Sequence, residues 1–330
     1  MPMMANIVSA ADVLAARLAV CPFFAHFNFN EMNSVVDISV VVPLLNEERY
    51  VGHCIESLLS QTYPKDRFEV IVIDNGSQDS SYAIVEQYPQ IKLLVESEKG
   101  SYAARNRGIT EASGSVIAFI DPDCMPDKDW LQNIASAMDE PDVLVLLGRR
   151  CLPSLLSSLS LLEAYENEKD EYVINGETET LYYGYTNNMA VRRKLFEDLG
   201  LFLKIPRGAD TIFVRRVADT YSGGVVRYRS DVVVTHMEVN NVASYYRKAF
   251  LYGRHRVLNN TITYAQPLGI RQRLEILRRA ILNRGLSMFE AARLLALLAG
   301  GGVMWHVGTL SRFGLPFKKE FVAAEDLKET

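Results

Sequence analysis

The stretch ISVVVP, residues 38–43, decides the fold of this chain of 330 residues. It is an apolar, mostly β-branched run that ends at Pro43, which is the pattern of a strand buried on both faces of a sheet. Beyond the proline, Asn46 is a favourable helix N-cap, and the two glutamates that follow it suit a first helical turn. Apolar residues then recur at helical spacing over 51–59, so the sequence predicts a strand, a turn and a helix.

The same alternation continues through the first half of the chain. Apolar runs predict further strands over 70–73, 91–95, 116–120 and 143–147. Helix-like segments cover 80–87 and 130–138. Strands that alternate with helices indicate an α/β fold with a doubly wound, mostly parallel sheet. Ligands of such sheets bind beyond the carboxyl ends of the strands. Three polar residues fall at those ends: Asn46, Asp74 and Asp121.

The second half of the chain has shorter elements and then a helical, basic tail. We expect helices over 155–172, 193–199 and 210–218, and strands over 225–228 and 232–234. We therefore divide the chain into an N-terminal extension (1–37), an α/β domain (38–240) with a first half (38–150) and a second half (151–240), and a basic helical C-terminal region (241–330).

Composition and charge narrow the function classes. The net charge of −5 gives no reason to expect nucleic acid as the main partner. The four cysteines form no C-x-x-C pair and no zinc-binding spacing, so we expect reduced, mostly buried thiols in a cytoplasmic protein. Residues 1–31 lack a signal-peptide pattern and a regular period, and we expect them to be a loose extension or a start-site artefact.

Two carboxylates follow one of the predicted strands, at Asp121-Pro122-Asp123. Carboxylate oxygens are the ligands that Mg²⁺ prefers, and a metal ion held there can neutralise charge on a departing nucleotide diphosphate. The D-x-D pattern alone is common and is often only a surface turn. Its place at the carboxyl end of a strand favours the functional interpretation.

Two further segments have the composition of a nucleotide site. In DNGSQD, residues 74–79, a turn places Asp74 where a base or a ribose could be hydrogen-bonded. In KGSYAARNRG, residues 99–108, small residues permit close backbone approach, and cations such as Arg105 suit phosphate. The alternative for residues 74–79 is an ordinary turn with no ligand, and the alternative for residues 99–108 is a solvated basic helix face.

These pieces occur in the order seen in family 2 glycosyltransferases of the GT-A fold, which the chain resembles over 38–256. The matching segments are PLLNEE (43–48), the turn at 74–79, ARN (104–106), Asp121-x-Asp123, GYTNNMAVRR (184–193), Gly208-Ala209-Asp210 with Arg216, and His236. Each motif is weak alone, but their common order makes the resemblance specific.

The resemblance implies that residues 38–240 form a GT-A domain with a nucleotide-binding half (38–150) and an acceptor half (151–240). It also implies a donor site for a nucleotide-diphosphate sugar, a UDP- or GDP-sugar. Asp74 would contact the nucleobase, and Glu47 would contact the nucleoside. The donor-binding set is completed by Pro43, Asn46, Arg105 and Asp121.

The resemblance also implies a metal ion and a base. Asp123 and His236 would ligate Mg²⁺ or Mn²⁺. Asp210 would be the base that deprotonates the hydroxyl of a glycan, lipid-linked or other acceptor, with inversion at the sugar. The family usually has Glu-Asp at the base motif, whereas this chain has Ala209 before Asp210, and Ile212 replaces the usual second acid.

That departure keeps two alternatives open. The first is a catalytically weak protein that binds sugar nucleotides. The second is a nucleotidyltransferase, which would normally show a glycine-rich loop with an arginine after the first strand, where this chain has LLNEE (44–48).

The C-terminal tail combines charge with apolar patterning. Between Arg247 and Arg284 there are nine basic residues and one acid, Glu275, and apolar residues recur on one helical face. Residues 294–311 then carry no charged side chain but include four glycines. The pattern favours docking on an anionic membrane surface. A soluble packed helix and a short membrane span are the alternatives.

Overall fold

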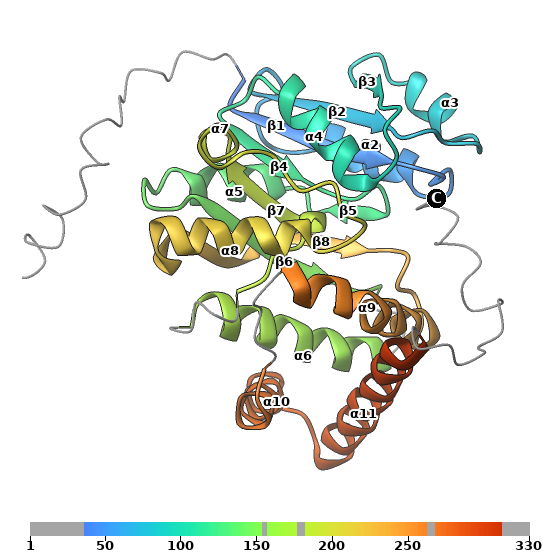
Figure 1. The fold of residues 1–330 in the computed structure, drawn as a ribbon, viewed down its shortest axis with the longest axis vertical. Coiled ribbons are helices and arrows are strands. Elements are labelled where there is room, and N and C mark those ends of the chain that lie inside the picture. The colour runs from blue at the N-terminus through green and yellow to red at the C-terminus, as the bar shows by residue number, and fades with distance from the viewer. Residues whose placement is uncertain (1–35, 154–156, 177–181, 263–267, 312–330) are drawn as a thin grey trace, which may run out of the picture. The chain divides into compact units, whose positions relative to one another are not determined.

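An eight-stranded sheet organises the described residues, which are 36–153, 157–176, 182–262 and 268–311 of the computed structural model (Figure 1). The strand order is β3-β2-β1-β4-β7-β6-β8-β5. The strands are β1 Ile38–Leu44, β2 Phe68–Asp74, β3 Lys92–Val95, β4 Val116–Phe119, β5 Cys124–Pro126, β6 Val145–Cys151, β7 Met189–Arg192 and β8 Val226–His236. Apart from residues 36 and 37, the predicted N-terminal extension lies outside the described residues.

The first half of the sheet is parallel. β1 pairs with β2 on one side and with β4 on the other, and β2 pairs with β3. All seven residues of β1 are buried, as expected for a strand covered on both faces. Because Leu44 pairs with Asp74, β1 and β2 end at the same edge of the sheet. The predicted mostly parallel α/β sheet is confirmed.

The second half of the sheet is mixed, which the sequence did not indicate. β7 is antiparallel to both β4 and β6, and β5 is antiparallel to β8. β8 is a single strand, so the prediction of separate strands over 225–228 and 232–234 is wrong. The polar break between them is a bulge, where the register with β6 shifts and where Arg229 and Asp231 form an exposed ion pair of 2.7 Å.

Helices cover both faces of the sheet. One core lies on the face covered by α2 (Val51–Leu59), α3 (Ser81–Glu86) and α5 (Trp130–Met138). The other lies on the face covered by α4 (Ser101–Glu111), α7 (Lys194–Leu199) and α8 (Ala209–Tyr221). Val40 and Val42 belong to the first core and Val41 to the second, because alternate residues of a strand point to opposite faces.

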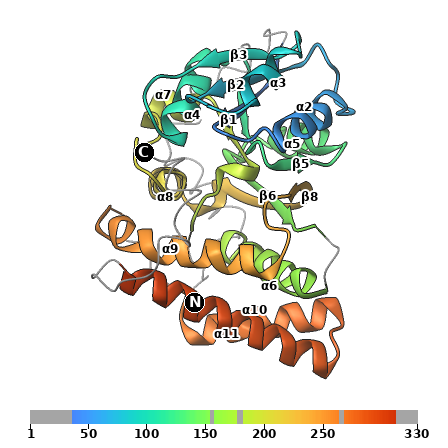
Figure 2. The same ribbon diagram turned by 90° about the vertical axis from the view of Figure 1, so that its right-hand side faces the viewer.

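Four helices extend the second half away from β1–β3, as Figure 2 shows. They are α6 (Ser157–Ile174), α9 (Val242–Ile262), α10 (Ile270–Arg284) and α11 (Met288–Ser311). A smaller apolar core joins α6, α10 and α11 through Leu161, Ile276 and Leu294. The predicted helical C-terminal region therefore packs on a helix of the predicted acceptor half.

The role predicted for Asn46 as a helix N-cap is wrong. α2 begins at Val51, and its N-cap position is Tyr50. Asn46 has a φ of 53°, a left-handed conformation that asparagine tolerates better than most residues. Its Oδ1 instead accepts a hydrogen bond of 2.8 Å from the backbone N–H of Gln78. The side chain thus ties the loop after β1 to the turn after β2.

Candidate active site

The predicted donor residues gather where β1 and β2 end. Asp74 is the last residue of β2 and is buried, and its carboxylate accepts a hydrogen bond of 3.1 Å from the backbone N–H of Gly76. The backbone N–H of Glu47 donates to Ser81 Oγ at 2.7 Å. The Glu47 bond and the Asn46 contact hold the loop after β1 against the turn after β2 and the start of α3. This lies at one edge of the sheet, where ligands of parallel sheets bind.

Asp123 and His236 meet because β5 pairs with β8. Asp123 Oδ2 lies 3.4 Å from His236 Nδ1, and both side chains are buried. His236 Nδ1 is also a buried atom with no hydrogen-bond partner among the described residues. A carboxylate oxygen beside an imidazole nitrogen with no partner is a donor set that fits Mg²⁺ or Mn²⁺.

Cys124 adds a third potential ligand atom to this pair. Its Sγ and the ligand atoms of Asp123 and His236 all lie within 4.8 Å of one another. Burial raises the pKa of the Cys124 thiol well above its usual range, so the sulfur stays protonated and is a poor ligand. The thiol instead contacts Asp123 Oδ1 at 3.6 Å. Of the described cysteines, Cys54 and Cys124 are free and buried, as predicted.

A lysine of α9 contacts the same histidine. Lys248 Nζ lies 2.8 Å from His236 Nε2 and 2.9 Å from the Glu238 carboxylate. Burial, reinforced by the ammonium of Lys248, lowers the pKa of His236, so the imidazole is neutral. Because an ammonium only donates, Nε2 accepts from it and Nδ1 carries the ring proton in this arrangement, so metal binding at Nδ1 requires Lys248 to release Nε2. Burial raises the pKa of Asp123, and the same ammonium opposes that effect. In the sequence, Lys248 is one of the nine basic residues of the C-terminal tail, and no motif marks it as part of a site.

α4 connects the donor edge to the second half of the chain. Arg105 is buried, and its Nη2 lies 2.6 Å from Asp121 Oδ1. The guanidinium stands 5.2 Å from the centre of the Tyr102 ring, and the Tyr102 hydroxyl accepts a hydrogen bond of 3.4 Å from the backbone N–H of Asp210. The alternative of a solvated basic helix face is wrong for Arg105, whose side chain is 6% exposed, but Arg107 of the same helix is 45% exposed and pairs with Glu111 at 2.9 Å.

Asp210 lies in the first turn of α8. Its Oδ1 accepts a hydrogen bond of 2.8 Å from the Thr211 backbone N–H, and its Oδ2 accepts one of 3.3 Å from the Thr186 backbone N–H. Burial raises the pKa of Asp210, although these hydrogen bonds oppose the effect. A carboxylate with a raised pKa is a stronger proton acceptor. Ala209, the departure from the family pattern, lies in the apolar core.

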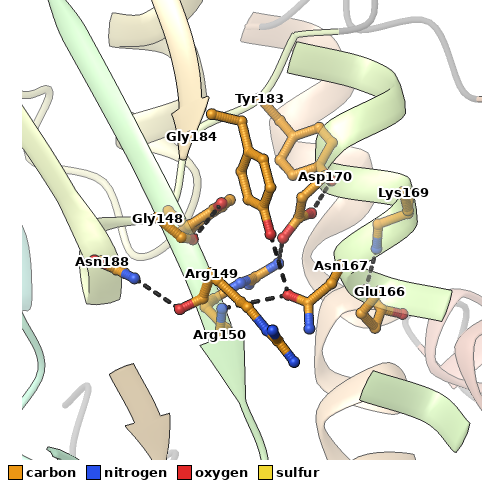
Figure 3. A network of polar contacts seen from close by, with 12 residues as sticks. Gly148, Arg149, Arg150, Glu166, Asn167, Lys169, Asp170, Tyr183, Gly184 and Asn188 are labelled. Carbon is orange, nitrogen blue, oxygen red and sulfur yellow. Dashed lines mark hydrogen bonds and ion pairs between the residues drawn. The ribbon is translucent and has the colours of Figure 1, made fainter. Parts of the chain in front are cut away.

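Figure 3 shows a polar network around Arg150 and Asp170, two residues that no sequence motif singled out. Arg150 of β6 donates to Asp170 of α6 at 2.7 Å, and its guanidinium stands 3.8 Å from the centre of the Tyr185 ring. The Tyr183 hydroxyl donates to the same Asp170, which is fully buried. Because Tyr183 and Tyr185 precede Thr186, this network holds the segment that donates to the Asp210 carboxylate.

Asn188 is a second polar residue whose role only the structure reveals. It is fully buried, and its Oδ1 accepts a hydrogen bond of 2.9 Å from Trp130 Nε1. Its Nδ2 donates to the backbone oxygens of Arg149 (2.8 Å) and Val232 (2.9 Å). It thereby joins α5, β6 and β8. The only signal in the sequence was its place in the 184–193 segment.

The structure thus brings most of the predicted residues into one connected region. Asn46, Glu47 and Asp74 share the donor edge, and Pro43 lies in β1 beside them, opposite Ile73. Arg105 contacts Asp121 rather than facing open solvent. Asp123 lies beside His236, and Asp210 is connected to Asp121 through α4. The individual roles in binding and catalysis stay predictions.

Comparison with known proteins points to one family. The model of glycosyl transferase family 2 matches residues 39–200. The glycosyltransferase AglE of Haloferax volcanii is 33% identical over 207 residues, which cover 60% of this chain and 66% of AglE. The match therefore spans just under two thirds of that relative's own length.

Two solved structures share the fold. The mannosyltransferase PcManGT from Pyrobaculum calidifontis, in complex with GDP-Man and Mn²⁺, is 20% identical with a TM-score of 0.53, covering 90% of this chain and 85% of its own. The S. aureus TarS fragment 1–349, in complex with UDP, is 20% identical with a TM-score of 0.50, covering 86% of this chain and 93% of its own. At this identity the likeness establishes the fold.

Proposed function

The chain belongs to glycosyl transferase family 2, and from this premise we propose that it transfers a sugar from a nucleotide-diphosphate sugar to an acceptor hydroxyl. The observation that carries the proposal is the arrangement around α4. This helix contacts Asp121, two residues before the Asp123–His236 pair, and it contacts Asp210 on the other side. A donor bound at the edge of the sheet would lie between a metal site and a base.

The donor edge fits a nucleotide by its chemistry. Asp74, Asn46 and Asp121 place hydrogen-bond acceptors at strand ends, and protein contacts already hold each of them. Groups that are held before binding lose little freedom when a ligand arrives. The ligands named for the two structural relatives, GDP-Man and UDP, support a GDP- or UDP-sugar as the donor of this chain.

The buried pair of Asp123 and His236 would hold a divalent cation, Mg²⁺ or Mn²⁺. The unpartnered Nδ1 and the adjacent carboxylate oxygen support this assignment. When bound, such an ion supplies positive charge for the leaving nucleotide diphosphate. The backbone N–H of Met237 donates to the Asp123 backbone oxygen at 2.9 Å and positions the pair. Lys248 would release Nε2 of His236 when Nδ1 binds the ion, because Nδ1 must give up its proton.

Asp210 would accept the proton of the acceptor hydroxyl on its carboxylate. The hydrogen bonds from Thr186 and Thr211 hold this carboxylate in place, and burial strengthens it as a base. A base on the acceptor side, opposite the leaving diphosphate, corresponds to an inverting transfer. Ala209 lies in the apolar core and leaves Asp210 as the acid of this motif.

The acceptor in this proposal is a glycan or lipid-linked hydroxyl, and the protein is cytoplasmic, with its C-terminal helices on the inner face of the membrane. The six arginines of residues 269–311, against two glutamates, support this location.

The test is a panel of UDP- and GDP-sugars offered to the purified protein with Mg²⁺ or Mn²⁺. We expect one donor to raise the melting temperature and to release nucleoside diphosphate during transfer or slow hydrolysis. Donor binding without turnover in the presence of glycan and lipid-linked acceptors would favour a sugar-nucleotide-binding protein. Release of pyrophosphate from a nucleoside triphosphate and a sugar phosphate would favour a nucleotidyltransferase.

A further inference from the structure

The C-terminal helices expose an unusual amount of apolar surface. Among the described residues, eight large apolar side chains of α10 and α11 are exposed: Ile270, Leu274, Leu282, Met288, Phe289, Leu295, Val303 and Leu310. Met288 and Phe289, at the start of α11, are 91% and 78% exposed. We call this set the α10–α11 face. So many large apolar side chains exposed on two neighbouring helices point to a site of contact with a partner or a membrane.

The exposed side of α11 carries no charged group after Arg293. Leu294, Gly301 and Gly308 are buried, whereas Leu295, Val303 and Leu310 on the other side are at least half exposed. By length and composition α11 is the one helix of the described chain that could cross a membrane, and 11% of its most apolar window is buried. The helix therefore needs a partner for its outer side.

Close packing against α9 keeps α11 on the protein. A methyl group on Gly308 would lie 2.0 Å from the Phe250 backbone oxygen, and one on Gly253 would lie 1.9 Å from the Trp305 backbone oxygen. Thr309 Oγ1 also donates to the Gly253 backbone oxygen at 3.1 Å. The glycines thus let the two backbones touch, as small residues do in tight helix pairs. A spanning orientation would break these contacts, so the geometry favours a helix that lies along a surface.

The charged residues around the α10–α11 face indicate which kind of partner it can bind. Residues 269–311 contain six arginines and two glutamates, a balance of +4 in a chain of net charge −5. Arg271 and Arg278 are exposed one helical turn from Leu274 on α10. A second copy of the chain that packed symmetrically on this face would bring positive charge against positive charge. An anionic surface would instead be attracted by the net positive charge that remains after Arg278 and Arg279 share Glu275 as an ion-pair partner.

We propose that the α10–α11 face lies in the plane of an anionic lipid membrane, with its apolar side chains in the lipid and its arginines at the headgroups. Amphipathic helices with this combination bind at the membrane interface. α9 relates the face to the candidate site, because it packs on α11 and carries Lys248, 2.8 Å from His236. This inference rests on the membrane location given under the proposed function and specifies the surface that binds. Membrane binding is measured without any transfer assay, so its failure can be told apart from a failure of the proposed transfer activity.

The experiment is co-flotation of the full chain with vesicles of phosphatidylcholine and phosphatidylglycerol in equal amounts, or of phosphatidylcholine alone. The matched variants are Val303→Asp on α11 and Val95→Asp on β3, whose valines are 60% and 59% exposed. Val303→Asp should weaken binding to the anionic vesicles about tenfold or more, because it replaces a lipid-buried apolar group with a charge. Val95→Asp should bind like the unmodified protein.

Charge reversal and salt provide the second arm of the test. Arg271→Glu with Arg273→Glu should weaken binding about tenfold or more, and salt should weaken it further. The proposal is overturned if the protein never floats or if Val303→Asp and Val95→Asp behave alike. It is also overturned if the protein floats equally with neutral vesicles and resists alkaline extraction, which indicates a spanning helix. A dimer in solution that Val303→Asp dissociates would assign the face to a second copy of the chain.

Discussion

The candidate active site and the α10–α11 face depart from ordinary folding preferences in opposite directions. In the site, the charged side chain of Asp123 is buried beside His236. On the α10–α11 face, large apolar side chains such as Met288 and Phe289 are exposed. Both arrangements lower the stability of the folded chain when nothing is bound to it. Buried charges lose their hydration, and exposed apolar groups stay in water. The comparison favours the proposal that something outside the chain completes each region, a divalent cation in one case and a membrane in the other.

If this comparison holds, substitutions in one region should leave the function of the other region unchanged. Changes at the site should remove chemistry and leave membrane binding intact. Changes on the C-terminal helices should alter stability or membrane binding and leave donor binding intact.

The largest expected effect is that of Asp210→Asn, which keeps the shape of the side chain but removes its basicity. We expect turnover to fall by about 10²–10⁴-fold, the usual contribution of a general base. Donor affinity, measured by thermal shift, should change little. The control is Asp219→Asn, at an exposed position of the same helix, which should keep normal turnover. Normal turnover of Asp210→Asn would mean that another residue is the base.

The pH dependence of turnover examines the same residue. Asp210 works as a base only when deprotonated, so the rate should fall as the pH falls through its pKa. Because burial raises this pKa, the acidic limb should lie above the range of an ordinary aspartate. If the rate instead falls in the pH range of an ordinary aspartate, burial does not strengthen Asp210 as a base.

Next in size is the effect of Asp170→Ala on stability. This change leaves the Arg150 guanidinium and the Tyr183 hydroxyl without their buried acceptor. We expect urea denaturation to report a loss of about 3 kcal/mol or more in the free energy of unfolding. The control is Asp142→Ala, in an ion pair with Arg227 whose side chains are 59% and 38% exposed. That variant should lose about 1 kcal/mol at most.

Removal of divalent metal should lower turnover about a hundredfold or more, since a bound cation contributes several kcal/mol to the stabilisation of a leaving diphosphate. Excess EDTA is the treatment, and added Mg²⁺ or Mn²⁺ should restore the rate. His236→Ala should bind Mn²⁺ more weakly in titrations that require no turnover. Full activity in EDTA would remove the metal from the proposal, and flotation with vesicles should be unaffected by either change.

The smallest effects separate the two sides of α11. Gly308→Ala forces a methyl group against the Phe250 backbone oxygen, and we expect a loss of about 1–3 kcal/mol in the free energy of unfolding. Gly302 faces open space, with no atom within 4 Å of an added methyl group. Gly302→Ala should therefore stabilise the helix by up to about 1 kcal/mol. Equal effects of the two changes would contradict the close packing of α11 on α9.

The parallel half of the sheet could be predicted because each of its strands carries its own signal. The ISVVVP run is buried on both faces of β1, and the polar residues at the ends of β1 and β2 lie at one edge because parallel strands end together. The mixed half could not be predicted in this way. β5 has three residues, and its antiparallel partner β8 lies about 110 residues later in the chain, so the pairing that sets Asp123 beside His236 leaves no local periodicity.

The sequence by itself determined the fold class, the donor edge and the identity of the residues proposed for the metal and base roles, because these depend on local hydrophobic pattern and on short motifs in order. Only the tertiary structure decided that Asn46 takes a left-handed turn instead of capping α2, that Arg105 is paired with Asp121, and that Arg150 and Asp170 hold the segment before Asp210. It also decided which side of α11 packs on α9 and which stays exposed. The physical reason is that burial and pairing depend on partners distant in the chain, which no local pattern records.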